Sequence, residues 1–232
     1  MKKYEPNQEK IEERLSELLD VLTADERKEL MSHMSICEYK KNETIYAEGE
    51  TPQQLLCLVK GKAKIYKAGI GRIQTLRIVQ AVEFFGFRAA FSGQAFITAA
   101  AAFEPSVIIK FPLSVVEKLI KGNSQLGWFF IKKLATALGK SDERTVGLAQ
   151  KHIRARLADS ILYLKECYGL LPDGQTLNCY IRREDMGHLS NMTTSNAIRT
   201  LGVFDAEGVI AISGRKIKII DEEKLRHISS MG

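Results

Sequence analysis

The sequence lacks a long hydrophobic run. Its longest nearly continuous apolar stretch covers residues 95–103 and includes a threonine, whereas a helix that spans a membrane needs about 20 apolar residues. The first ten residues, MKKYEPNQEK, also lack the apolar segment of a secretory signal peptide. We therefore expect a protein that has no contact with a membrane and stays in the cytoplasm.

Cysteine and histidine are also scarce. The four cysteines are widely scattered and lack the paired spacing of a metal site: Cys37, Cys57, Cys167 and Cys179. Such scattered thiols are typical of a reduced, cytosolic protein. His33 is the only histidine before His152, so the first half of the chain has few candidates for a haem ligand. We expect neither a metal nor another cofactor.

What remains is an ordinary globular composition. The 232 residues are 45% apolar and 27% charged, which suits one large or two modest domains. The net charge of +6 weakly favours a polyanionic partner. The sequence shows no nucleophile–base pair, no paired carboxylate motif and no phosphate-cradling glycine loop. An enzyme is therefore the weakest hypothesis, and we expect no catalytic activity.

Residues 181–220 carry the most informative pattern. The spacing predicts one helix over residues 183–189 and, after a turn, a second helix that begins at the N-cap residue Thr193. Apolar residues at i, i+4 and i+7 form a buried stripe on this second helix: Ala197, Leu201 and Phe204. Its outer face is polar and carries Thr194, Ser195, Asn196 and Arg199. Such a face can hydrogen-bond base edges in the major groove of DNA.

A basic hairpin follows these helices. Two short strands, residues 209–213 and 217–220, are joined by the turn Gly214-Arg215-Lys216, and a basic tip of this kind suits phosphate contact. The alternative is a three-helix cluster with a hairpin and no ligand, because helix-turn-helix patterns have many false positives.

The segments REDMGHLSNMTTSNAIRTLGVFDAEGVI and GRKIKIID resemble a known family. They are similar, without gaps, to the winged helix-turn-helix that ends regulators of the cyclic-AMP receptor protein and fumarate–nitrate reductase regulator (CRP/FNR) family. This resemblance implies a transcription regulator that binds double-stranded DNA and, if it is an activator, RNA polymerase.

The resemblance also assigns roles to single residues. Family members use an arginine and a glutamate, then an arginine one turn later, to read bases. Here Thr194 and Ser195 occupy the first two positions and only Arg199 is kept, so the family's usual operator is not expected. Arg199 suits guanine and Asn196 suits adenine. Four residues are placed to contact phosphates: Arg182, Thr193, Arg215 and Lys216.

Residues 36–112 read as short strands separated by glycines, which indicates a β-sandwich or barrel. The order KKNETIYAEGE, LLCLVKGKAKIYK, RIQTLRIV, FFGF resembles the β-roll effector domain of the same family. The fold class is therefore α+β: an N-terminal β-roll, similar to a cyclic-nucleotide-binding jelly roll, then a long dimerisation helix and a C-terminal winged helix. The predicted domains are residues 1–150 and 151–232.

The segment FFGFRAAFSGQAFITAAAAF departs from the family's phosphate cassette. Phe87 and Ile97 stand where nucleotide-binding members carry glutamate and arginine, and only Thr98 and Ala99 match. Arg88 lies one residue beyond the glutamate position and, in an extended segment, would point to the opposite side. Burial of a phosphate without a cation is costly, so we expect no cyclic nucleotide.

The same apolar residues leave two alternatives. They could line a pocket for an uncharged effector, or they could fill the cavity and leave the protein without a ligand. The effector-pocket candidates are Phe87, Arg88, Phe91, Ile97 and Thr98.

Residues 124–150 predict one long helix with apolar positions at alternating spacings of three and four. These positions form a heptad seam: Ile131, Leu134, Leu138, Ser141, Thr145 and Leu148. The seam predicts a homodimer, which suits the two-fold symmetric operators of helix-turn-helix proteins. The alternative is a helix that packs only on its own domain.

A homodimeric DNA-binding transcription regulator, controlled through a hinge near Gln150, explains these features together. The rival from another class is a signal-binding module that acts on a protein partner and keeps a vestigial winged helix. The loss of arginine and glutamate at the first two reading positions mildly favours that rival, whereas Arg199 and the basic hairpin tip oppose it.

Overall fold

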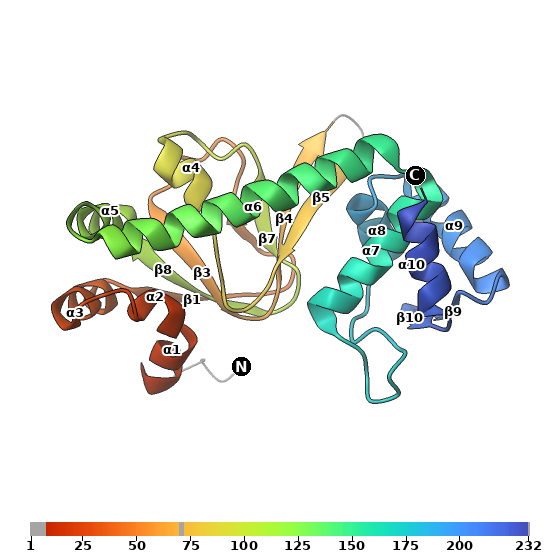
Figure 1. Cartoon of the computed structure of the whole chain (residues 1–232), viewed down its shortest axis with the longest axis horizontal. Helices are drawn as coiled ribbons and strands as arrows, with labels where there is room; N and C mark the ends of the chain where they lie inside the picture. Colours follow the sequence, from red (N-terminus) through yellow and green to blue (C-terminus); the bar gives the residue numbers. More distant parts are fainter. Residues whose placement is uncertain (1–7, 70–71, 232) are drawn as a thin grey trace. The chain divides into compact units, whose positions relative to one another are not determined.

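The computed structural model describes residues 8–69 and 72–231 and divides into two compact units (Figure 1). The N-terminal unit comprises residues up to 67 together with 77–139, and the C-terminal unit comprises 68–76 and 140–232. Helix α6 (Ser124–Gln150) contributes to both units and has the bounds that its sequence predicts. The domain boundary after residue 150 stays a prediction. Gly71, at the predicted tip of a hairpin, lies outside the described residues.

Three short helices open the N-terminal unit: α1 (Gln8–Arg14), α2 (Ser16–Leu19) and α3 (Ala24–Ser32). The break before α3 falls at Thr23, which forms a capping box with Glu26. The Glu26 carboxylate accepts a 2.8 Å hydrogen bond from the Thr23 amide, and the Thr23 hydroxyl accepts one from the Glu26 amide. Both contacts satisfy donors that a helix start would otherwise leave free.

Two four-stranded sheets follow, as the short strands predict. The first has the order β1 (Ser35–Tyr39), β8 (Ser106–Pro112), β3 (Gln54–Lys60), β6 (Glu83–Phe85). The second has the order β2 (Thr44–Tyr46), β7 (Ala99–Ala102), β4 (Ala63–Gly69), β5 (Arg72–Val79). Neighbours that are distant in sequence, such as β1 and β8, pair antiparallel, which is the arrangement of a β-roll.

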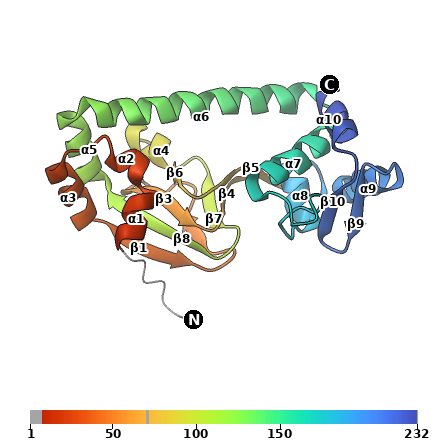
Figure 2. The ribbon, with the colours of Figure 1, turned by 60° about the horizontal axis from the view of Figure 1, so that its bottom comes forward.

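The main core of this unit lies between the first sheet and the helices. Alternate residues of β3 and β8 point to one face, because side chains alternate along a strand. They pack against α1 to α3, α5 (Leu113–Gly122) and the first turns of α6, which Figure 2 shows on the side of that sheet. Fully buried members of this core include Leu15, Leu18, Cys57, Ile109, Phe111 and Leu126. Burial of each such side chain contributes about 1.5–3 kcal/mol.

The segment between Gly86 and Gly93 is a helix, α4 (Phe87–Ser92), and not extended. Both glycines adopt positive φ, +78° and +67°, and mark the two ends of this helix. Our expectation for the direction of Arg88 held only for an extended segment, so it does not apply to this helix.

The C-terminal unit contains four helices and a hairpin after α6. They are α7 (Ile153–Tyr168), α8 (Arg183–Leu189), α9 (Thr194–Ala206), β9 (Ile210–Ser213), β10 (Lys216–Ile219) and α10 (Glu222–Ser230). Their core is apolar and includes Leu157, Ile161, Leu164, Met186, Phe204 and Leu225. Sequence reasoning missed α10, although Asp221 caps it by accepting a 2.9 Å hydrogen bond from the Lys224 amide.

Residues 177–181, which precede α8, form no strand. Only isolated bridges form, between Leu170 and Leu177 and between Thr176 and Lys218. The neighbouring strand β10 is four residues long, so its free edge offers little length for pairing before the chain turns away.

Candidate nucleic-acid interface

Helices α8 and α9 form the predicted helix-turn-helix. The Thr193 hydroxyl accepts a hydrogen bond of 3.2 Å from the Asn196 amide and caps α9. Gly187 allows α8 to approach the start of α9 closely. A Cβ atom there would lie 3.0 Å from the Met192 carbonyl oxygen and 3.3 Å from the Thr194 amide nitrogen.

Two arginines bind the turn between these helices. Arg144 Nη2 donates to the carbonyl oxygen of Leu189 at 3.0 Å, and Arg156 Nη1 donates to that of Asn191 at 3.2 Å. Burial lowers the pKa of the Arg144 guanidinium, which nevertheless stays charged. These positioning residues come from α6 and α7, so sequence spacing within the motif gave no signal for them.

The outer face of α9 presents the predicted polar groups. Ser195 and Arg199 are exposed, and Thr194 and Asn196 are partly exposed. Arg199 Nη2 donates a hydrogen bond of 3.0 Å to Asn196 Oδ1. The contact directs the two longest polar side chains of this face toward one another and uses the Asn196 oxygen. It leaves the Asn196 amide group and the other nitrogens of Arg199 for a further partner.

The β9–β10 hairpin lies beside α9 in both views (Figures 1 and 2). Gly214 adopts a φ of +58° in its turn, a conformation that favours glycine. Arg183, on α8, donates from Nη2 to the Gly214 carbonyl oxygen at 2.8 Å and so ties the turn to the first helix. Arg215 and Lys216 are exposed next to this anchored turn.

Two of the candidate phosphate contacts also serve the fold. Arg182 Nε donates to Asp185 Oδ2 at 3.0 Å, and this aspartate is 5% exposed. The Thr193 hydroxyl caps α9. A phosphate could therefore be contacted only by the remaining atoms: the Nη groups of Arg182 and the hydroxyl hydrogen of Thr193.

Sequence reasoning missed two exposed apolar side chains near this face. Ile198 on α9 is 53% exposed and Tyr180, before α8, is 67% exposed. The Lys216 ammonium lies 5.7 Å from the centroid of the Tyr180 ring. The signal for Ile198 was available, because it follows Thr194 by four residues and so lies on the same side of the helix.

The structure brings the candidate effector residues together only in part: Phe87 packs on Phe91, and the charge of Arg88 acts on Tyr46, which hydrogen-bonds Thr98. The ring centroids of Phe87 and Phe91 lie 6.0 and 5.1 Å from that of Phe130, on α6, and 6.1 Å from each other. Phe87 is 6% exposed and belongs to the main core. Both phenylalanines therefore contribute to the packing between α4 and α6.

The other candidates lie elsewhere. Ile97 is 59% exposed and Arg88 is also exposed. Thr98 is buried and hydrogen-bonds the Tyr46 hydroxyl, whose pKa burial raises. Phe96 stacks on the Tyr46 ring with centroids 3.8 Å apart. The position of the family's arginine thus points to solvent, and that of its glutamate lies in the core.

The candidate dimer seam on α6 divides into two groups. Ile131 and Leu138 are 53% and 64% exposed, whereas Leu134 packs against the core of its own unit. Trp128, which we did not predict, is 56% exposed and precedes Ile131 by three residues. The last three seam positions are exposed or half-buried: Ser141, Thr145 and Leu148.

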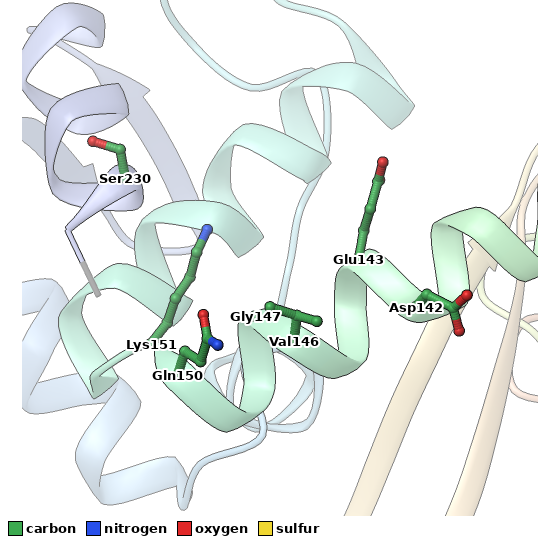
Figure 3. A pocket seen from close by; sticks show the side chains of 7 residues that line it. All are labelled: Asp142, Glu143, Val146, Gly147, Gln150, Lys151 and Ser230. Atoms are coloured by element: carbon green, nitrogen blue, oxygen red, sulfur yellow. The ribbon is translucent and has the colours of Figure 1, made fainter.

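A surface hollow of about 460 Å³ lies between the end of α6 and the end of α10 (Figure 3). It is lined by Asp142, Glu143, Val146, Gly147, Gln150, Lys151 and Ser230. Lys151 already pairs with Asp159 at 2.8 Å.

No set of three or more His, Cys, Asp or Glu side chains in the described part of the chain could hold a metal ion. Over residues 8–69 and 72–231, no helix is long and apolar enough to cross a membrane.

Two family models match the chain. A cyclic nucleotide-binding domain matches residues 36–123, and a Crp-like helix-turn-helix domain matches residues 155–228. Among curated proteins, the chain is 24% identical over 187 residues to the global nitrogen regulator of Nostoc sp., covering 78% of this chain and 83% of that protein. It is 21% identical to the CRP-like cAMP-activated global transcriptional regulator of Mycobacterium tuberculosis, covering 84% and 88%.

Solved structures share the fold. FixK2 from Bradyrhizobium japonicum superimposes with a TM-score of 0.74 at 22% identity, covering 86% of this chain and 98% of that one. A CRP/FNR-family regulator from Thermus thermophilus superimposes with a TM-score of 0.70 at 21% identity, covering 85% and 99%. Both similarities extend over the two units, so the order of β-roll, long helix and winged helix is that of these structures.

Proposed function

The chain belongs to the CRP/FNR family of transcription regulators, and from this premise we propose how it selects its DNA. A homodimer reads a two-fold symmetric operator with α9 and grips the backbone with the β9–β10 hairpin, without control by cyclic AMP. The observation that carries the proposal is the exposed pair of Arg199 and Asn196, joined at 3.0 Å near the start of α9. The first residues of a recognition helix are those that meet base edges.

Base reading follows from the chemistry of this face. The fork of Arg199 matches the O6 and N7 acceptors of guanine, and Asn196 suits adenine. Thr194 and Ser195 can donate or accept a hydrogen bond beside them. The guanidinium also holds Asn196 Oδ1, so the two residues act as one unit. One such bidentate contact discriminates against a wrong base by about 1–3 kcal/mol.

Phosphate contacts set affinity and register. We assign them to Arg182, Thr193, Arg215 and Lys216, which flank the reading face. From Lys151 onward the sequence has twelve Lys and Arg against ten Asp and Glu, a net charge of about +2. So small an excess gives moderate, salt-sensitive affinity for one subunit. A dimer on two half-sites gains the avidity that one subunit lacks.

The dimer forms through α6. Trp128, Ile131 and Leu138 follow one another at spacings of three and seven and are each more than half exposed. This is the spacing of a coiled-coil seam, in which such residues pack against a partner helix. Ser141, Thr145 and Leu148 continue it, and Leu134 stays with its own core.

Control by cyclic AMP is opposed by two residues. Phe87 occupies the position of the family's glutamate and packs against Phe91 and Phe130. Ile97 occupies the position of its arginine and cannot neutralise a phosphate. On the strength of these two positions we assign this chain no cyclic nucleotide, unlike the relative named as cAMP-activated. It works without catalysis in the cytoplasm, where an activator would also contact RNA polymerase. The rival hypothesis is a signal-binding module that acts only on a protein partner. It gives the Arg199–Asn196 pair no role.

The test is selection from random duplex DNA by the purified full chain, with and without cyclic AMP. We expect the same two-fold symmetric consensus in both arms. A consensus that appears only with cyclic AMP contradicts the proposed control. Lack of enrichment in both arms contradicts the proposal as a whole.

The dimer has its own test. Leu138→Glu places a charge on the exposed seam, and we expect analytical ultracentrifugation to detect monomers and half-site binding only. Thr136→Glu is the matched control, because it adds the same charge at an exposed position two residues away on another side of α6. Dimers that persist in Leu138→Glu would place the interface elsewhere.

A further inference from the structure

We propose that Ile198 reads the C5-methyl group of a thymine and so selects an A·T pair next to the base pair read by Arg199. The inference rests on the proposed DNA-binding function and names a part of the operator. Its starting point is an apolar side chain, 53% exposed, on a helix face that is otherwise polar.

The position of Ile198 defines what it can meet. It follows Thr194 by four residues and precedes Arg199 by one, so it lies on the outer face of α9, within its first two turns. The buried stripe of this helix, with Ala197 and Leu201, faces the core instead. Four residues after Ile198 comes Gly202. In the described part of the chain, no heavy atom lies within 4 Å of where its Cβ would be, apart from its chain neighbours and the backbone of its own helix. The surface beside Ile198 is therefore open.

Ile198 adjoins the polar face of α9 that is proposed to read bases, so DNA is the partner expected to cover it. A partner that approaches Arg199 and Ser195 along the face must also cover Ile198, since the three are neighbours on the helix. In a major groove the edges of adenine, guanine and cytosine offer hydrogen-bonding groups, whereas thymine also offers a methyl group. A thymine methyl is thus the group in the groove that an isoleucine can contact without leaving a polar atom unpaired.

The stiffness of the side chain favours such reading. A β-branched residue in a helix has one strongly preferred χ1 rotamer. Ile198 therefore loses little rotational freedom when a methyl group packs against it. A flexible apolar side chain would lose more.

The experiment uses the consensus duplex that the full chain selects. Each thymine of one half-site is replaced in turn by uracil, which removes the methyl group and keeps every hydrogen-bonding group. For the wild-type chain we expect one thymine whose replacement weakens binding by about fourfold, the effect of removing one methyl-sized apolar group from a contact. For Ile198→Ala we expect thymine and uracil at that position to bind equally.

Val203→Ala is the matched control. Val203 is 38% exposed and lies on the same helix, but farther from its start. This variant must keep the wild-type preference for thymine. Ile198→Ala truncates an exposed side chain, and an unchanged melting temperature verifies its fold.

The possible outcomes distinguish a failure of the Ile198 assignment from a failure of the proposed DNA-binding function. If the wild-type chain selects DNA but no thymine-to-uracil exchange distinguishes it from Ile198→Ala, the assignment of Ile198 is wrong and the DNA-binding function stands. Equal weakening of both proteins by uracil overturns it as well, because the methyl group would then act on DNA shape. If the chain selects no DNA, the proposed function itself fails.

Discussion

The start of α9 and the segment around α4 are both places where the resemblance to the CRP/FNR family implies ligand-binding polar residues, and the side chains of this chain differ between the two places. On α9 the polar side chains stay exposed, and Arg199 meets Asn196 at 3.0 Å. On α4 the matching position is Phe87, 6% exposed and packed on Phe130. The two places therefore differ in exposure: polar side chains face outward at the start of α9, whereas an aromatic ring is buried at the start of α4.

The physical difference is how much each side chain contributes to the stability of the fold. The Phe87 ring is removed from water in the core of its own unit, and this burial stabilises the fold. Arg199 gains little from an exposed hydrogen bond within the same helix, so its identity serves a partner. Substitutions at the two places should therefore change different measurements.

The largest effect is expected at α4. Phe87→Ala should lower the free energy of unfolding by about 3–5 kcal/mol, because it removes a buried ring and leaves a cavity. Urea denaturation followed by fluorescence measures this. The control is Ile97→Ala, which truncates a side chain that is 59% exposed and should cost less than about 0.5 kcal/mol. A neutral Phe87→Ala would mean that the ring lines an open effector pocket.

The second effect concerns affinity and not stability. Arg199→Ala should weaken specific DNA binding by about 1–3 kcal/mol for each half-site and leave the melting temperature unchanged. Arg226→Ala is the control, since this exposed arginine on α10 pairs with Glu222 within its own helix. Fluorescence anisotropy with the selected duplex measures both. A fall in melting temperature would show that Arg199 also supports the fold, and would weaken the contrast with Phe87.

A smaller effect should separate the hairpin from the recognition helix. The double substitution Arg215→Ser and Lys216→Ser should reduce the slope of log K against log salt by about 1.8 per subunit, near 0.9 for each lost phosphate contact. The selected consensus should stay the same, because phosphates carry no sequence information. Lys224→Ser, on α10, should leave the slope unchanged. A changed consensus would mean that the hairpin reads bases.

The smallest effect is expected at the loop around Asp173, which bridges to strand β10 through Thr176 and Lys218. The Thr176 hydroxyl donates to Asp173 Oδ2 at 2.6 Å, and the amides of Thr176 and Gln175 donate to Oδ1. These bonds lower the pKa of Asp173 from 3.8 to about 2. The folded-state pKa lies below the unfolded one, so the stabilisation is present above the ordinary pKa and is lost as the pH falls through about 2.

An NMR titration of the Asp173 carboxyl group measures this pKa directly. The midpoint should lie near 2, and Thr176→Ala should move it toward the ordinary value of 3.8. A midpoint at the ordinary value in the wild-type chain would show that the hydrogen bonds from Thr176 and Gln175 to the Asp173 carboxylate do not persist in solution.

Local rules made several elements predictable. The bounds of α6 and α8, the cap at Thr193 and the buried stripe of α9 follow from helical spacing and capping, which depend on residues within about four positions. The close approach at Gly187 was also predictable, because a glycine that faces a neighbouring helix across a tight turn leaves room for its backbone. The polar groups on the outer face of α9 followed from the same periodicity.

Other features depended on residues far apart in the chain. The sequence left it open whether Phe87 and Phe91 line a pocket or fill a core, and it gave no signal for Phe130, on a different helix, which packs on both. The heptad pattern gave Leu134 the same role as Ile131, but only the packing of α6 on the sheet and helices of its unit buries one and exposes the other.

By itself the sequence determined helices α6, α8 and α9, the cap at Thr193 and the polar face of α9, because short-range spacing and hydrogen bonding fix them. The tertiary structure decided which apolar residues are core and which are surface, and so separated Phe87 from Ile198. It also decided that Arg183 holds the hairpin turn and that Arg144 holds the end of α8. The reason is physical: burial and long-range hydrogen bonds depend on what the folded chain brings alongside a residue, which spacing along the sequence does not specify.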